Sequence, residues 1–110
     1  MFIVDKDKNI YTVLHDTAHF KMEIAPYEVK ENDTLTFTVR KRYGSNIVLT
    51  TNADEDGMFH IESDMYDGVE PGNYLYDLQL TTGEGEIYTV VPAHPITIDI
   101  EITEEVADAE

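Results

Sequence analysis

The sequence contains no cysteine and no tryptophan, and its basic residues are few. Without cysteine, neither a disulfide nor a thiolate metal site can form. Small secreted domains often depend on disulfides, so the absence of cysteine favours an intracellular origin. No apolar run reaches membrane-spanning length. The first residues, Met-Phe-Ile-Val, are followed at once by Asp5 and Lys6, so no signal-peptide core is present and synthesis in the cytoplasm is expected.

Negative charge dominates the composition, with 23 acidic against 7 basic residues and a formal net charge of −16. A surface this negative repels phosphate backbones and anionic lipids, so the sequence predicts neither a nucleic-acid partner nor a membrane partner. The acidity favours solubility and limits non-specific binding. The alternative interpretation is that it attracts a cation or a basic partner.

The most informative stretch is a pair of runs around residues 82–85. Residues 74–81 alternate, with tyrosine and leucine side chains on one face and mostly polar side chains on the other, which is the period of a β-strand. Residues 82–85 supply two glycines for a turn, and residues 87–91 return as a run of aromatic and β-branched residues. This pattern predicts a β-hairpin.

Similar alternating runs predict strands elsewhere in the chain. They cover residues 10–14, 18–24, 35–40, 47–51, 58–62 and 96–102. About eight short strands, separated by turn signals every 8–12 residues or so, are typical of an all-β fold, and the spacing predicts an antiparallel β-sandwich or barrel. We expect one domain over residues 1–103 and a frayed acidic tail over residues 104–110.

The last predicted strand presents four alternating isoleucines, and an open edge there would favour pairing with another chain. Asp99 and Glu101 lie between the isoleucines on the outer face. Two interpretations stay open: the two acids prevent edge pairing, or the edge is used for assembly.

The loop at residues 52–57 resembles the first half of a calcium-binding loop, because acidic or amide side chains alternate before Gly57. The match then fails, because Ser63 stands where a bidentate carboxylate is needed and the flanking residues predict strands. A solvated hairpin loop fits better. If a cation binds, Asp54 and Asp56 are the candidate ligands, with low affinity.

Residues able to carry out catalysis are scarce. The 4 histidines are not spaced as a metal pair on one strand face and are interpreted as ordinary surface residues. Both serines lie in or beside predicted turns, outside any nucleophile-elbow context. The sequence therefore predicts no catalytic residue, no cofactor and no enzyme activity.

Residues 70–74, Glu-Pro-Gly-Asn-Tyr, have the pattern of a tyrosine corner, in which a tyrosine hydroxyl bonds to a backbone group a few residues upstream. Tyr74 would supply the hydroxyl, and Pro71 and Gly72 would form the turn. This motif predicts the corner of a two-sheet sandwich.

Three stretches together resemble a known family. They are similar to immunoglobulin-like domains of phage and prophage tail and baseplate structural proteins. The stretches are the strand Tyr74-Leu-Tyr-Asp-Leu-Gln-Leu80 with its turn and return strand, the segment 16–20 (Asp-Thr-Ala-His-Phe) and the segment 32–39 (Asn-Asp-Thr-Leu-Thr-Phe-Thr-Val). The type concerned is the N-terminal domain of upper baseplate proteins. The resemblance covers most of residues 10–106, with His15 standing where glycine is usual.

The resemblance implies an antiparallel β-sandwich of immunoglobulin-like type. It also implies a non-catalytic structural module of a virion, acting through protein–protein contacts. Its implied partners are other tail or baseplate proteins, or copies of itself. The alternative from the residues alone is a surface module that binds calcium or carbohydrate, for which the loop at residues 52–57 is the distinguishing feature.

Overall fold

The computed structural model describes residues 1–42 and 44–100. Strands make up nearly all of its regular structure, and no helix in this part of the chain is long and apolar enough to cross a membrane. The elements in order are β1 (Phe2–Val4), β2 (Ile10–Val13), β3 (Ala18–Phe20), β4 (Thr34–Arg40), β5 (Ile47–Asn52), β6 (Phe59–Ile61), a 3₁₀ turn η1 (Ser63–Tyr66), β7 (Gly72–Thr81) and β8 (Ile87–Asp99).

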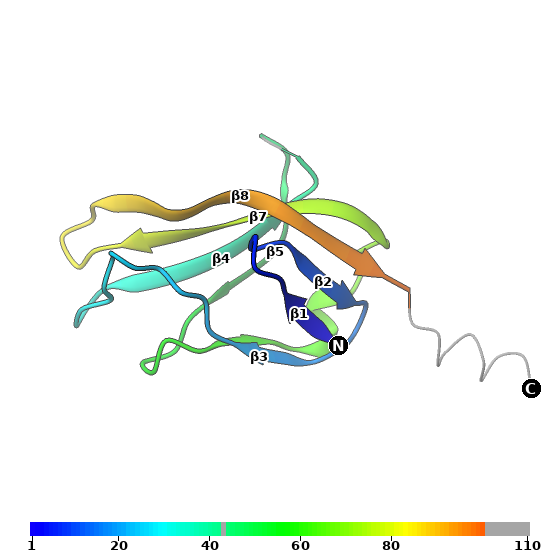
Figure 1. Ribbon diagram of the computed structural model, residues 1–110, viewed down its shortest axis with the longest axis horizontal. Helices are drawn as coiled ribbons and strands as arrows, with labels where there is room; N and C mark the ends of the chain where they lie inside the picture. The colour runs from blue at the N-terminus through cyan, green and yellow to red at the C-terminus, as the bar shows by residue number, and fades with distance from the viewer. Residues whose placement is uncertain (43, 101–110) are drawn as a thin grey trace, which may run out of the picture.

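The strands form two sheets that face each other across the core (Figure 1). The larger sheet has six strands in the order β1-β2-β8-β7-β4-β5, and the smaller pairs β3 with β6. β8, β7, β4 and β5 take the G-F-C-C′ order of an immunoglobulin-like sandwich, and β3 with β6 takes the place of its B-E pair. The predicted all-β, immunoglobulin-like sandwich is therefore confirmed.

One part of that prediction is wrong, because the sandwich is not wholly antiparallel. β2 runs parallel to β8, with Ile10 opposite Ile96 and Val13 opposite Asp99. The 3₁₀ turn and five strands separate the two in the chain, so no hairpin constrains their direction. Ile10, Ile96 and Ile98 are all buried, and this shared burial holds the parallel pair together.

Two strands differ in extent from the prediction. β1 was not predicted, since its three residues are too few to show a period. β3 ends at Phe20, whereas the alternation predicted a strand to residue 24. Its partner β6 offers only three paired residues, so the ladder stops there, although Met22 and Ile24 still pack against the core.

β8 also differs, because the runs at residues 87–91 and 96–102 belong to one strand of 13 residues. Pro92 and Pro95 lie within it, and the pairing with β7 shifts register at Pro92 and again at Val90. β2 pairs only with the segment from Ile96 to Asp99, so among the described residues the outer edge of β8 from Ile87 to Pro95 has no paired strand. Proline is tolerated there because an edge strand needs no outward N–H donor.

Ile96 to Ile98 are paired with β2 on one side and with β7 on the other, so this part of the isoleucine run has no open edge. Residues 101–102, the domain limit at 103 and the predicted tail at 104–110 lie outside the described residues.

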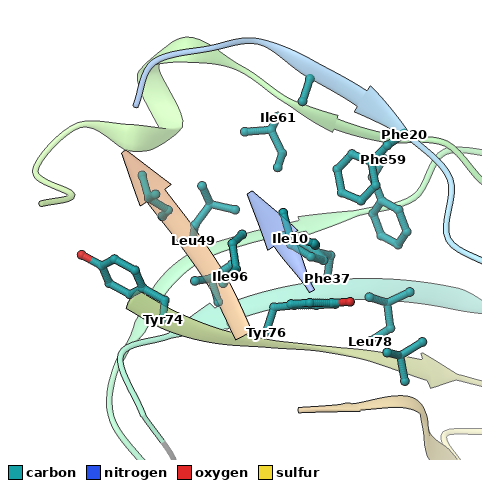
Figure 2. Packing of buried hydrophobic residues seen from close by; sticks show 14 of the residues in the cluster. Ile10, Phe20, Phe37, Leu49, Phe59, Ile61, Tyr74, Tyr76, Leu78 and Ile96 are labelled. Carbon is teal, nitrogen blue, oxygen red and sulfur yellow. The ribbon is translucent and has the colours of Figure 1, made fainter. Parts of the chain in front are cut away.

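Aromatic rings join the two sheets (Figure 2). Phe20 of β3 and Phe59 of β6 stack with ring centroids 5.2 Å apart. On the larger sheet, the rings of Phe37 and Tyr76 are also 5.2 Å apart, and Phe37 meets the Phe20 ring edge-on at 5.4 Å. Buried aromatic side chains remove large apolar areas from water, so this cluster fixes the small sheet on the large one.

Candidate functional site

The tyrosine corner is present at the start of β7. The Tyr74 hydroxyl donates a hydrogen bond to the backbone carbonyl of Glu70, as the sequence predicted. Gly72 has a φ of +153°, a conformation that side chains disfavour, and Pro71 precedes it as an exposed turn residue. The Lys41 ammonium lies 4.6 Å from the centroid of the Tyr74 ring. The corner contributes to the fold and presents no reactive group.

Asp54, the first cation candidate, closes its own loop. One carboxylate oxygen accepts hydrogen bonds from the backbone N–H of Asp56 at 2.9 Å and of Met58 at 3.0 Å. The other oxygen lies 2.7 Å from Nε2 of His60. The hydrogen bond to His60 is the main cause that lowers the pKa of the Asp54 carboxyl. Both carboxylate oxygens of Asp54 therefore already have hydrogen-bond partners within the protein.

Asp56, the second candidate, takes part through its backbone N–H, and its side chain is exposed at the tip of the loop. Within residues 1–42 and 44–100, no three His, Cys, Asp or Glu side chains gather closely enough to hold a metal ion among them. The geometry at Asp54 is that of a turn in which a carboxylate caps backbone donors.

The sequence reasoning missed a contact between two histidines. His19 of β3 and His60 of β6 are direct cross-strand partners, and their Nδ1 atoms lie 2.7 Å apart. His60 in turn contacts Asp54, so the three side chains form a continuous hydrogen-bonded chain on the outer face of the small sheet. The alternation of each strand places both rings outward, but the pairing of β3 with β6 is non-local and no local pattern reveals it.

His15 and His94 lie elsewhere. His15 has a φ of +67°, the left-handed conformation that glycine adopts most readily, at the position where the resembled family has glycine. Its Nδ1 lies 3.1 Å from the carbonyl oxygen of Ser63. His94 contacts the carbonyl of Pro92 within β8.

A groove lies where the β7–β8 turn meets the long loop between β3 and β4. We call it the hairpin-end groove, and its accessible volume is about 770 Å³. It is lined by residues 26–28, 30–33, 80, 82–84, 86 and 88. In Figure 1 the β7–β8 turn lies at the far end of the molecule from the point where β8 ends.

The groove combines exposed aromatic rings with negative charge. Tyr27 and Tyr88 are 41% and 42% exposed, and their ring centroids are 6.3 Å apart. Five acidic side chains line the groove against one lysine, Lys30. The charge of Glu86 is the main cause that raises the pKa of the Tyr88 phenol. The potential in the groove is therefore negative.

Asp33 holds the loop in shape and fastens it to the turn. Asp33 accepts hydrogen bonds from the backbone N–H of Lys30 at 2.9 Å and of Gly83 at 3.3 Å. A Cβ at Gly83 would lie 2.9 Å from the Cβ of Asn32, closer than such atoms approach, so only glycine allows this contact. The shape of the groove is thus fixed by the fold itself.

No protein-family model matches the chain, and no curated protein is significantly similar to it. Two solved structures are similar in shape. CopC from Methylosinus trichosporium OB3b is 13% identical with a TM-score of 0.39, over 61% of this chain and 63% of that one. Murine CRIg is 10% identical with a TM-score of 0.39, over 92% of this chain and 97% of that one. The chain thus spans 63% of the CopC chain. Similarity this distant carries no argument about function.

Proposed function

We propose that this domain is a non-catalytic structural module of a phage or prophage tail or baseplate, and that it binds a neighbouring tail protein through the hairpin-end groove. The phage context comes from the resemblance of the residues around Tyr74 to the immunoglobulin-like domains of such particles. The contact surface comes from the fold. The virion is the corresponding location of the protein.

The observation that carries the proposal is the position and content of the groove. It lies between the loops that correspond to B–C and F–G of an immunoglobulin-like sandwich, the end at which variable domains bind their ligands. This correspondence is an analogy of fold. The groove adds its own physical support, because exposed tyrosines are enriched where proteins bind one another.

The chemistry of the groove defines the partner. Its excess of acidic side chains favours a segment that carries lysine or arginine, whose cation would lie among the carboxylates and against the faces of Tyr27 and Tyr88. A second copy of the chain suits the groove less well, because a formal net charge of −16 repels its like. The partner is therefore a different tail protein with a basic surface.

The test mixes the purified chain with each tail protein encoded beside it and measures the mass of the mixture by light scattering. We expect a defined complex with one of them that weakens as salt is raised. Replacement of Tyr88 by alanine or of Glu86 by lysine should weaken the complex by about tenfold or more, because each removes a groove contact.

Asp67→Lys is the matched control, since it makes the same charge change at an exposed position outside the groove. This variant should bind as the wild type does. A complex that Tyr88→Ala and Glu86→Lys leave intact would contradict the groove as the contact surface, and the absence of any complex would contradict the proposed function.

A second candidate function, carbohydrate binding, is favoured by the same two tyrosines. Sugars stack on aromatic faces and hydrogen-bond to carboxylates, and the groove offers both. Binding on a glycan array that is lost in Tyr88→Ala would favour this candidate. Calcium binding at Asp54 receives less support, because its carboxylate oxygens already accept hydrogen bonds from the loop and from His60.

A further inference from the structure

We infer that His19 and His60 form a two-histidine binding site for a late first-row divalent metal ion, with Cu²⁺ or Ni²⁺ as the best-suited ions. The site lies on the outer face of the β3–β6 sheet, apart from the hairpin-end groove. Imidazole nitrogen is a preferred ligand of these ions. The two Nδ1 atoms come from directly paired residues and face one another at 2.7 Å.

The hydrogen bond from His60 to Asp54 leaves Nδ1 of His60 with a lone pair that can bind a metal. The Asp54 carboxylate can only accept, so Nε2 of His60, 2.7 Å away, carries the proton and donates it. Neutral His60 then has its lone pair on Nδ1, where it accepts from the Nδ1–H of His19. A carboxylate that holds the far nitrogen of a histidine in this way is a common outer contact of metal-bound histidine.

His19 needs one change to become the second ligand. Its proton must move from Nδ1 to Nε2, which leaves a lone pair on each Nδ1 atom. The exchange can pass through water, because the His19 side chain is exposed. Both rings must then turn slightly, so that the two lone pairs meet at an ion beside the line that joins the nitrogens. A metal ion bound to both Nδ1 atoms would then take the place of the hydrogen bond between them, with no change in the pairing of β3 and β6.

The spacing of the two nitrogens favours one coordination geometry. With metal–nitrogen bonds of about 2.0–2.1 Å, two ligands at a right angle are roughly 2.9 Å apart, and two ligands of a tetrahedron are roughly 3.3 Å apart. The observed 2.7 Å is nearer to the right angle. Square-planar or tetragonal ions such as Cu²⁺ and Ni²⁺ therefore fit with less movement than Zn²⁺ does.

The rest of the coordination shell is open. In the part of the chain that the structure describes, no third His, Cys, Asp or Glu side chain completes a cluster, so water would fill the remaining positions. The side chains of His60 and Asp54 are 41% and 38% exposed, which leaves room for an ion to enter. The site is thus a surface chelate that a donor from a bound partner could complete.

The test is calorimetric titration of Cu²⁺, and separately of Zn²⁺, into the full chain. We expect one equivalent of Cu²⁺ to bind more tightly than Zn²⁺, and paramagnetic resonance of the complex to show two nitrogen ligands. His19→Gln and His60→Gln should each weaken Cu²⁺ binding by about tenfold or more, and Asp54→Asn by roughly tenfold through the lost outer contact.

His94→Gln is the matched control and should bind Cu²⁺ as the wild type does, since His94 lies on β8 in the other sheet and its ring contacts the carbonyl of Pro92. Circular dichroism checks that each variant is folded. If His60→Gln unfolds, His19→Gln still tests the site, because position 19 is exposed and the substitution should not disturb the fold. Binding that persists unchanged in His19→Gln would place the ion elsewhere, such as at the chain's terminal amine, and would overturn the inference. No binding to the wild type would do the same.

Discussion

Three buried tyrosines each place a hydroxyl group on a polar partner. Tyr74 donates to the carbonyl of Glu70, Tyr76 donates to the carbonyl of Lys8, and the Tyr66 hydroxyl lies 3.4 Å from that of Thr12. A buried hydroxyl without a partner is costly, so each pairing fixes where a ring can lie. The Lys8 contact joins residues 68 apart in the chain, which ties the β1–β2 turn to the centre of the sheet.

Removal of the Tyr74 hydroxyl tests the corner. Tyr74→Phe keeps the ring but leaves the Glu70 carbonyl without its donor, so we expect a loss of about 1–2 kcal/mol in the free energy of unfolding. Urea unfolding measures this loss. Tyr11→Phe serves as the control, because Tyr11 is exposed and should unfold as the wild type does. Equal stability of Tyr74→Phe and wild type would show that the corner bond contributes nothing.

Tyr76 predicts how stability changes at alkaline pH. Burial raises the pKa of the Tyr76 phenol from 10.0 to about 12. Because the folded state favours the neutral phenol, Tyr76 contributes its full stabilisation to the free energy of unfolding below pH about 10. Between pH about 10 and about 12 the unfolded chain loses this proton first, so the free energy of unfolding falls as pH rises.

Urea unfolding at several alkaline pH values measures that fall, and it should be smaller in Tyr76→Phe. Part of the decrease in the free energy of unfolding should remain in Tyr76→Phe, because burial also raises the pKa of the Tyr66 phenol. Tyrosinate absorbance reports the ionisation directly. The prediction fails if all seven tyrosines of the folded protein ionise over the same pH range as in the unfolded chain.

Among the elements, the β7–β8 turn and the loop before β4 depend on one another. Gly83 contacts Asn32 so closely that a methyl group at position 83 must displace the loop. Gly83→Ala should therefore cost about 1–3 kcal/mol of stability and weaken binding at the hairpin-end groove. Glu84→Ala, one residue later on the exposed turn, should change stability by less than about 0.5 kcal/mol.

Thermal unfolding of the two variants measures the difference. If Gly83→Ala unfolds at the wild-type temperature, the loop has no fixed contact with the turn, and the groove does not have the shape described above.

Local patterns predicted most of the strands but not how they pair. The hairpin of β7 and β8 was predicted because alternation, a glycine turn and a return strand are adjacent in the chain. The sequence predicted two strands where β8 is one, because Pro92 indicated the end of a strand. Proline is tolerated within a strand where the edge is open. The parallel pairing of β2 with β8 depends on contacts between residues more than 80 positions apart, which no local period encodes.

The candidate site was predicted unevenly for the same reason. The Tyr74 corner is a local motif, and the sequence predicted its hydrogen bond. Asp54 was identified by its spacing, but spacing could not reveal that its oxygens accept hydrogen bonds from the loop and from His60. The contact between His19 and His60 needs the register of β3 against β6, and the groove needs the position of Tyr27 beside Tyr88.

At the scale of the molecule, the features that stabilise the fold and those that suit binding occupy opposite ends of β7. The Tyr74 corner lies at its start, and the hairpin-end groove lies at its other end, around Leu80 and the following turn. The two-histidine site lies on the other sheet. Groove residues such as Tyr88 and Glu86 can therefore change with the partner while the core around Phe37 and Phe59 stays intact.

The most direct test of the proposed function is the light-scattering mass of the chain mixed with each tail protein proposed as its partner, for the wild type, Glu86→Lys and Asp67→Lys. We expect the chain alone to be a monomer. One proposed partner should form a salt-sensitive complex with the wild type and with Asp67→Lys, and little or none with Glu86→Lys. A complex of equal strength with all three proteins, or no complex with any proposed partner, would contradict the proposed function.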